Sequence, residues 1–501
     1  MNPVIEHVVF SGVTRHGKTK ACIKTNLPRM RMRDGPAFVW IDPPGTGVEE
    51  AQGHLVRYGI PFLADTLHET GTTLGYDFFS PSQNPDSEQR EAENREAVFE
   101  AIAVAIRSRG LTSVEGNPII RQGLQDAFSI LINQKTAVPF TILRNCFVKE
   151  SDNFQYLVEH CTDPQTYLKF MYYGGLSAKD REYHCGPAER IIQAICDCPQ
   201  FKRRCVPTFD LAEFLNEGGK LFIDGRSVGN LSRPDSSLLM GQIILTVIRL
   251  ARSGKLKRRV VLIIDEGKNA DLIDLNLVRA MAEAGKWGLE IQVLIQNPLF
   301  KDMNITDELF QNANTRFLFK HTNPASAQFV AEMIGYPKLD PLVIRKTEYR
   351  TVQRHDGFDL EQVISTGEWK SEDGKAGAST NHGTVARPRY KEEIEEHDVL
   401  YSLDDLIKLK RRDVTNLGVG ECHIMQGNSV TNQPEYLPML QDPWPGQKFS
   451  RHPYIPRWQE ELRVYLEQLK ATNPAYQCGV IKLPAWTPPP QPPKKRKSGL
   501  D

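Results

Sequence analysis

The sequence lacks an excess of either charge, because its 62 lysines and arginines are balanced by 62 aspartates and glutamates. This balance removes any global electrostatic argument for nucleic-acid binding, which would have to depend on local positive patches. No apolar run is long enough to cross a bilayer: the longest candidate, residues 238–245, is interrupted by Gln242 and closed by Arg249. The first residues also lack the features of a secretory signal, so we expect a cytoplasmic protein.

The nine cysteines include no C-x-x-C pair. Without a secretory signal, they are expected to be free thiols in a reducing compartment. One group has the residue types that zinc prefers. Burial as small apolar side chains is the favoured explanation of this group, and a zinc site is the alternative. The group consists of His184, Cys185, Cys196, Cys198 and Cys205.

A complete phosphate-loop pattern, G-x-x-x-x-G-K-[ST], stands near the start of the chain. It follows an apolar run, residues 7–11, and such a loop binds phosphate when a strand precedes it and a helix follows. Lys18 is expected to bridge the β- and γ-phosphates of ATP, and the Thr19 hydroxyl to ligate Mg²⁺. A chance match is the alternative, which the strand context disfavours. The expected nucleotide-binding residues are Gly12, Val13, Thr14, Arg15, His16, Gly17, Lys18, Thr19 and Lys20.

A second apolar run, residues 260–264, ends in Asp265 and Glu266. A run without polar residues is typical of a strand buried on both faces of a parallel sheet. At the carboxyl edge of that sheet, Asp265 is expected to hold Mg²⁺, and Glu266 to activate water as a general base. The alternative is an ordinary strand that ends in two solvated acids.

The order of strand and helix patterns predicts an α/β fold with a mostly parallel central sheet and an all-α insertion. Strands and helices alternate at first, helical periodicity then dominates, and strands resume near residue 220. We therefore expect an ATPase domain of residues 1–83 and 208–440, an all-α inserted domain of residues 84–207, and a C-terminal extension of residues 441–501.

Two stretches of biased composition carry further expectations. Residues 367–388 are rich in Gly, Ser, Thr and charge, and are expected to form a mobile loop. The proline-rich residues 484–493 and the basic residues 494–497 form an extended tail. Contact with nucleic acid or an acidic partner, a nuclear address and a solvated tail without a specific role all stay open for this segment.

The order of these parts resembles the HerA/FtsK superfamily of DNA-pumping ATPases, and within it most resembles the conjugative coupling proteins of type IV secretion (TraG/TraD-like). The resemblance covers about residues 5–440, and its most specific motifs are the phosphate loop and the pair Asp265 and Glu266. It implies a RecA-like P-loop NTPase fold that uses ATP and Mg²⁺. It also implies a homo-hexameric ring that translocates DNA without sequence preference.

The same resemblance suggests roles for three further residues. Gln296 would sense the γ-phosphate, with an ordinary polar strand end as the alternative. Arg316 and Lys286 are candidates for the basic residue that reaches a neighbouring subunit's nucleotide. Gly285 stands where coupling proteins often have arginine, which weakens the assignment of that trans-acting residue.

Other departures concern the start of the chain. Coupling proteins usually carry an N-terminal membrane anchor and HerA proteins an N-terminal barrel, but only residues 1–6 precede the first expected strand. We therefore expect a member without an anchor, which a partner recruits to the membrane or which works away from membranes. Arg15 and His16 replace the small residues common in the loop, and Pro44 replaces a frequent lysine.

Three functions follow from this reading. The leading one is a DNA translocase of conjugative transfer, with a secretion-channel protein or a relaxase as partner. The second is an ATPase of DNA processing, packaging or phage defence beside a separate nuclease. The third is a nucleotide-gated adaptor, which Glu266 disfavours because a pure switch seldom needs a general base beside the metal aspartate.

Overall fold

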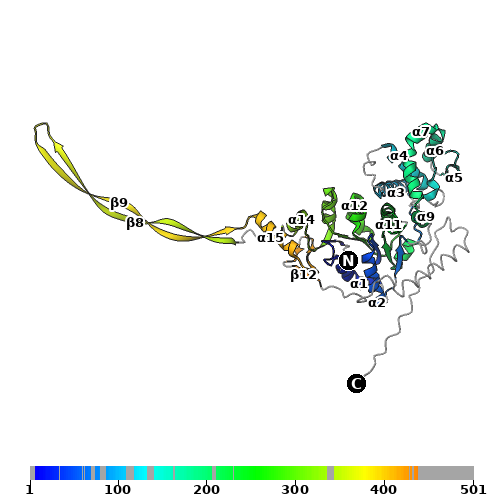
Figure 1. The fold of residues 1–501 in the computed structure, drawn as a ribbon, viewed down its shortest axis with the longest axis horizontal. Helices are drawn as coiled ribbons and strands as arrows, with labels where there is room; N and C mark the ends of the chain where they lie inside the picture. Colours follow the sequence, from blue (N-terminus) through cyan, green and yellow to red (C-terminus); the bar gives the residue numbers. More distant parts are fainter. Residues whose placement is uncertain are drawn as a thin grey trace, which may run out of the picture. The chain divides into compact units, whose positions relative to one another are not determined.

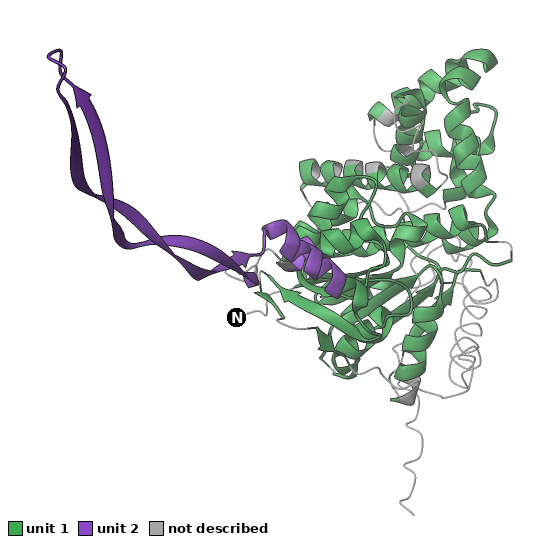
Figure 2. Cartoon of the chain, turned by 60° about the vertical axis from the view of Figure 1, so that its left-hand side comes forward, with its two compact units in different colours: residues 1–330, 414–501 green, residues 331–413 purple. Residues whose placement is uncertain are grey.

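A computed structural model describes most of the chain up to residue 437. The chain divides into two compact units, residues 1–330 with 414–501 and residues 331–413 (Figure 2). The proline-rich basic tail lies outside the described residues. The described residues are 6–32, 34–58, 60, 62–68, 74–78, 86–108, 118–132, 140–161, 164–205, 210–229, 231–335, 344–427, 429–431 and 434–437.

A mostly parallel sheet forms the centre of the first unit, as the sequence predicted. Among the described residues, its parallel strands follow the order β7-β1-β6-β5-β2-β4-β3, and β10 adds to β7 in the antiparallel direction. Strands β1, β2, β5 and β6 are buried along their whole length. The bounds are β1 His7–Ser11, β2 Ala37–Asp42, β3 Leu63–Thr66, β4 Lys220–Asp224, β5 Val260–Asp265, β6 Leu289–Ile295, β7 Ala313–Leu318, β10 Glu421–Gln426, β11 Ser429–Val430 and β12 Glu435–Tyr436.

Helices pack on this sheet because their apolar faces match its buried faces. Phe10 of β1 stacks on Phe317 of β7 with ring centroids 4.7 Å apart, and both join a core that includes Trp40 and residues of the first helix. No described helix is both long and apolar enough to cross a membrane. The helices of the first unit outside the insertion are α1 Lys18–Arg31, α2 Thr46–Arg57, α10 Leu211–Asn216, α11 Arg233–Arg252, α12 Leu275–Ala284 and α13 Met303–Asn312. Helix α14 Pro324–Gly335 begins in the first unit and ends in the second, and most of α15 Leu403–Asn416 belongs to the second unit.

The predicted all-α insertion follows β3 and returns to β4. Helices α4 to α7 lie together in Figure 1. Its cysteines Cys185, Cys196, Cys198 and Cys205 are buried, and burial raises the pKa of the Cys185 and Cys196 thiols to about 12. The helices are α3 Ser87–Ser108, α4 Pro118–Ile132, α5 Asp152–His160, α6 Pro164–Gly175, α7 Ala178–His184, α8 Gly186–Cys196 and α9 Pro199–Arg204. The domain bounds at residues 84 and 207 remain predictions.

Two contacts tie the insertion to the sheet domain. Helix α3 packs closely on α11, where a Cβ on Gly241 would lie 2.6 Å from a Val104 methyl carbon, so glycine permits the approach. At the end of the insertion, Arg204 of α9 forms a buried ion pair with Asp65 of β3, with 2.7 Å between Nη2 and Oδ1. Two charges without solvent access need such a pairing, since an unpaired buried charge is strongly destabilising.

The second unit corrects one prediction. Residues 367–388, expected as a mobile loop, belong to a long antiparallel hairpin of β8 (Ile344–Lys370) and β9 (Ala376–Leu400). The composition was misleading because glycine and serine favour loops, whereas regular cross-strand pairing stabilises both strands here. Arg387 on β9 bonds Glu361 on β8 at 2.8 Å, for example. Almost every residue of both strands is exposed.

Candidate active site

The phosphate loop between β1 and α1 is fixed by backbone bonds to neighbouring strands. The Gly12 N–H donates to Ile295 O (3.1 Å), and the His16 carbonyl accepts from the Gly420 N–H (3.2 Å). A Cβ on Gly12 would lie 2.5 Å from the Phe319 Cβ, so only glycine fits there. Gly17 caps α1 in the left-handed region, with φ 99°, which a side chain would disfavour.

The first two residues of α1 point into the site. Lys18 is 5% exposed, and its Nζ donates to Val13 O at 3.0 Å. Burial lowers the pKa of Lys18, while the charges of Asp265 and Glu266 oppose that shift. The Thr19 hydroxyl donates to Asp265 Oδ2 at 3.1 Å. The first helical turn therefore connects directly to the end of β5.

The remaining loop residues take less central positions. Thr14 and Arg15 are exposed at the tip of the loop, and Arg15 has a left-handed backbone with φ 63°. The His16 ring bonds the Thr14 carbonyl at 3.0 Å. Lys20 lies one residue beyond the pattern and pairs with Glu50 of α2 at 3.7 Å. Lys20 is therefore engaged with a neighbouring helix in this structure.

Asp265 has the character expected of a magnesium ligand. It is 3% exposed, and burial together with the Glu266 charge raises its pKa to about 7, against the opposing effects of Lys18 and Thr19. Its Oδ1 has no hydrogen-bond partner among the described residues. A buried carboxylate oxygen without a donor, beside a hydroxyl, suits Mg²⁺, which prefers oxygen ligands. Thr19 and Asp265 thus fit the metal that the sequence predicts.

Glu266 is held by two amide side chains. Gln296 Nε2 donates to Glu266 Oε1 at 2.5 Å, and Asn269 Nδ2 donates to Oε2 at 3.3 Å. Gln296 reaches Glu266 because β6 lies between β1 and β5, so its carboxyl end stands between the phosphate loop and the acidic pair. Glu266 itself has φ 49°, a left-handed conformation that non-glycine residues adopt rarely and that clusters at functional sites.

A phosphate loop at the carboxyl edge of a parallel sheet, with its threonine bonded to the acid of a neighbouring strand, completes the pattern. This is the P-loop NTPase fold. No family model and no curated protein matches the chain. Solved structures resemble it at low sequence identity, so their likeness concerns the fold alone.

Two proteins represent these structures. The bacterial conjugative coupling protein TrwB, in its unbound form, is 14% identical, with 88% of this chain and 87% of TrwB covered and a TM-score of 0.46. TrwB in complex with the non-hydrolysable ATP analogue ADPNP gives the same values. VirB4 of Thermoanaerobacter pseudethanolicus is 12% identical, with 86% and 90% covered and a TM-score of 0.46. TrwB belongs to the coupling proteins that the sequence motifs resemble.

The two candidate trans-acting residues lie away from this cluster. Arg316 of β7 is half-buried opposite Val9 of β1, and its Nε donates to Ala313 O at 3.0 Å. Lys286 is exposed in a short 3-10 helix, Gly285–Trp287, that directly precedes β6. Since β1 and β6 are parallel, Lys286 lies at the sheet edge opposite the phosphate loop. Their action on a neighbouring subunit remains a prediction.

Sequence reasoning missed four residues around the site. Asn269 holds Glu266, Gly420 holds the loop backbone, and His321 bonds Ser11 at the base of the loop. The fourth is Asp42, where burial and the nearby Asp265 charge raise the pKa of the carboxyl. Of these four, only Asp42 could have been found from the sequence, because it follows an apolar strand pattern as Asp265 does. The others come from segments that carry no motif.

The histidine gives a pH-dependent prediction. His321 is 1% exposed, its Nε2 lies 3.2 Å from Ser11 Oγ, and burial with the Lys18 charge lowers its pKa to about 4. Between pH 6.5 and 4 the unfolded chain binds a proton that the folded chain does not, so stability falls as pH falls.

We expect wild type to lose about 2 kcal/mol more of its free energy of unfolding than His321→Gln between pH 6.5 and pH 5. Thermal unfolding at both pH values measures this, and glutamine keeps a polar atom for Ser11. An equal loss in the two proteins would contradict a buried neutral His321.

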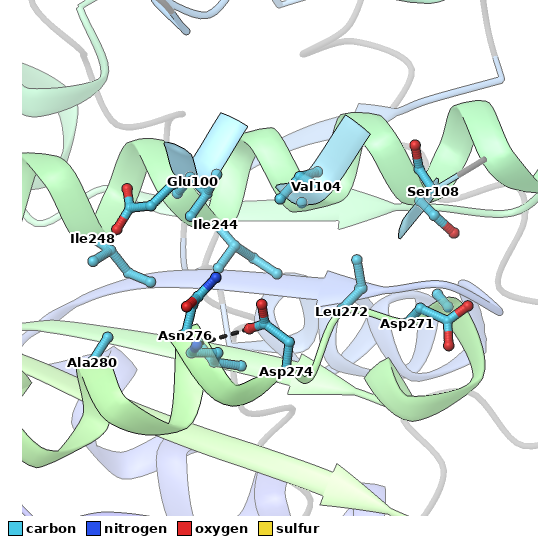
Figure 3. Close-up of a pocket in the computed structure, with 15 residues that line it drawn as sticks. Glu100, Val104, Ser108, Ile244, Ile248, Asp271, Leu272, Asp274, Asn276 and Ala280 are labelled. Atoms are coloured by element: carbon cyan, nitrogen blue, oxygen red, sulfur yellow. Dashed lines mark hydrogen bonds between the residues drawn. The ribbon is translucent and has the colours of Figure 1, made fainter. Parts of the chain in front are cut away.

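Two of the cavities among the described residues of the first unit lie away from this site. One of about 30 Å³ lies between α3, α11 and α12, where Figure 3 shows Val104, Ile244 and Leu272 around it. Such a volume holds a water molecule or two, not a nucleotide. The other, of about 650 Å³, includes Arg252 and Trp287 in its lining. No residue of the phosphate loop lines either cavity.

Proposed function

We propose that this chain is a Mg²⁺-dependent ATPase that uses hydrolysis to translocate DNA as a ring of identical subunits. One observation carries the enzymatic part: Lys18, the Thr19–Asp265 bond and the Gln296–Glu266 bond meet at one edge of the sheet. A phosphate cradle, a metal position and a general base are what hydrolysis of a nucleoside triphosphate requires.

The residues divide the reaction between them. Lys18 leaves Val13 O to bind the β- and γ-phosphate oxygens, and the loop N–H groups and the start of α1 stabilise the same charges. Thr19 and Asp265 would hold Mg²⁺, which when bound would supply positive charge to the phosphates. Glu266 accepts a proton from the water that attacks the γ-phosphorus as the bond to the leaving β-phosphate oxygen breaks. Gln296 and Asn269 orient the Glu266 carboxylate.

The DNA substrate and the ring rest on the sequence resemblance to DNA-pumping ATPases. In that arrangement DNA contacts go mostly to phosphates, so binding weakens as salt rises. The balanced composition of 62 basic and 62 acidic residues is compatible with this only if positive side chains gather locally, as on loops that line a pore. A secretion-channel protein or a relaxase would be the partner in conjugative transfer.

Steady-state ATP hydrolysis, measured with and without single- and double-stranded DNA, tests the proposal. We expect turnover that depends on Mg²⁺ and rises several-fold with one strand form. Sedimentation with ATP, Mg²⁺ and DNA should show a hexamer. Turnover indifferent to DNA would favour a protein-handling ATPase or an adaptor, and a nuclease that co-purifies would favour DNA processing.

A further inference from the structure

Three neighbouring strands of the sheet each end in an aspartate at the edge that carries the phosphate loop. Asp42 of β2 is in register with Asp224 of β4. The register of β2 with β5 runs up to the pair Ile41 and Ile264, so the next positions are Asp42 and Asp265. Residues in register on parallel strands project to the same face, with the strands about 4.8 Å apart. We call these three residues the aspartate row.

The three carboxylates of the aspartate row differ in the partners that compensate their negative charge. Asp224 is bound by the Arg226 guanidinium, with 2.9 Å between Nε and Oδ2. Asp265 accepts a side-chain hydrogen bond from the Thr19 hydroxyl. Asp42 is fully buried, and among the residues that the structure describes its Oδ2 accepts backbone bonds from the Gly47 N–H (2.7 Å) and the Val48 N–H (3.1 Å).

Asp42 and Asp265 therefore share one feature. Each is buried, and within the described residues each has an Oδ1 without a hydrogen-bond partner. A buried acceptor left unsatisfied is costly, and more so for a charged group. Asp42 Oδ2 caps the start of α2, but this role does not account for the burial of Oδ1 without a hydrogen-bond partner.

The Oδ2 atoms of the two carboxylates lie close to the same position, the Cα of Gly47 on α2. A Cβ built on Gly47 would lie 2.6 Å from Asp265 Oδ2, 3.2 Å from Asp42 Oδ2 and 2.9 Å from the Thr19 methyl carbon. The absence of a side chain at position 47 thus keeps the space between Thr19, Asp42 and Asp265 open. Two neighbouring buried carboxylates without a bound arginine are stabilised by a cation between them.

We propose that Asp42 is a second carboxylate of the Mg²⁺ site, acting beside Thr19 and Asp265. This inference rests on the proposed ATPase function. Mg²⁺ takes oxygen ligands and usually keeps several waters, so Asp42 binds the ion or the water shell around it. Asp42 then contributes to metal affinity and not to binding of the nucleotide itself.

Mn²⁺ is the probe for this role, because its binding is read directly by electron paramagnetic resonance. The titration uses the full chain with the non-hydrolysable analogue ADPNP, and the variants are Asp42→Asn and Asp42→Ser. Both replacements keep a side-chain oxygen that can cap α2. We expect Mn²⁺ affinity to fall about 10- to 100-fold in both, while ADPNP binding without metal stays unchanged.

Asp224→Asn is the matched control, since it removes an acid from the same row whose charge Arg226 already compensates. Its Mn²⁺ affinity should stay at the wild-type value. Wild-type Mn²⁺ affinity in both Asp42 variants would overturn the inference and leave Asp42 as a helix cap. Failure of the wild-type chain to bind ADPNP at all would instead refute the proposed function.

Discussion

Glu266→Gln lowers steady-state ATP hydrolysis by about 10²–10⁴-fold, the range expected when a general base is removed. ATP binding stays at the wild-type level, because the role proposed for Glu266 is toward the attacking water and not toward the phosphates. Glutamine has the same shape and keeps an oxygen that can accept the Gln296 bond now made at 2.5 Å. Its NH₂ group takes the place of Oε2, where the exposed Asn269 side chain can turn its amide oxygen to accept the bond. The loss is therefore chemical and not structural. Turnover under saturating ATP and Mg²⁺, beside ATP binding measured by titration, gives both quantities.

Glu283→Gln provides the control for this variant. Glu283 is an exposed acid on α12, so its neutralisation changes the net charge by the same amount without touching the site. Its turnover should match wild type. Normal turnover in Glu266→Gln would remove Glu266 as the base and revive the adaptor reading. A variant that neither binds nor hydrolyses ATP would show that Glu266 shapes the nucleotide pocket itself.

The sheet was readable from the sequence because its strands are uninterrupted apolar runs. Residues 7–11 were expected as a strand and form β1, the apolar run 260–264 lies in β5, and strands resume with β4 near residue 220 as expected. Parallel strands covered on both faces leave this signature. The helical insertion was equally legible, since 3.6-residue periodicity replaces the strand runs between β3 and β4.

The strands of the hairpin, β8 and β9, could not be predicted from uninterrupted apolar runs. Its strands lie almost entirely exposed, so they carry no apolar run, and their glycines and charged residues have a loop-like composition. Their pairing depends on cross-strand partners such as Arg387 and Glu361, which lie far apart in the sequence. Local composition does not encode such a register.

Some residues of the candidate site could likewise be predicted from the sequence and others could not. The sequence pointed to Lys18, Thr19, Asp265 and Glu266 because their motifs are contiguous. The order of strands in space was not available from the sequence, and it is this order that sets Gln296 against Glu266 and Asp42 beside Asp265. Strand order follows from crossovers between distant segments, which no local motif reports.

Lys18→Ala weakens ATP binding by about 10²-fold or more. A buried ammonium makes charge-assisted bonds to phosphate, each worth about 1.5–3 kcal/mol, and about 1.4 kcal/mol is a factor of ten in affinity. The loss goes beyond those bonds, because Lys18 is also the positive charge that faces Asp265 and Glu266. Without it, two neighbouring acids repel the incoming phosphates.

Lys18→Met separates charge from packing, since methionine fills the space of the buried stem of Lys18, which is 5% exposed. We expect it to melt near the wild-type temperature and to bind ATP as poorly as Lys18→Ala. Lys24→Ala, further along α1, removes the same charge outside the phosphate loop and should bind ATP normally. Titration calorimetry with ATP and Mg²⁺ measures all three. Wild-type affinity in both Lys18 variants would mean that the phosphate-loop pattern arose by chance, and the metal, base and aspartate assignments would then lose the phosphates they were built around.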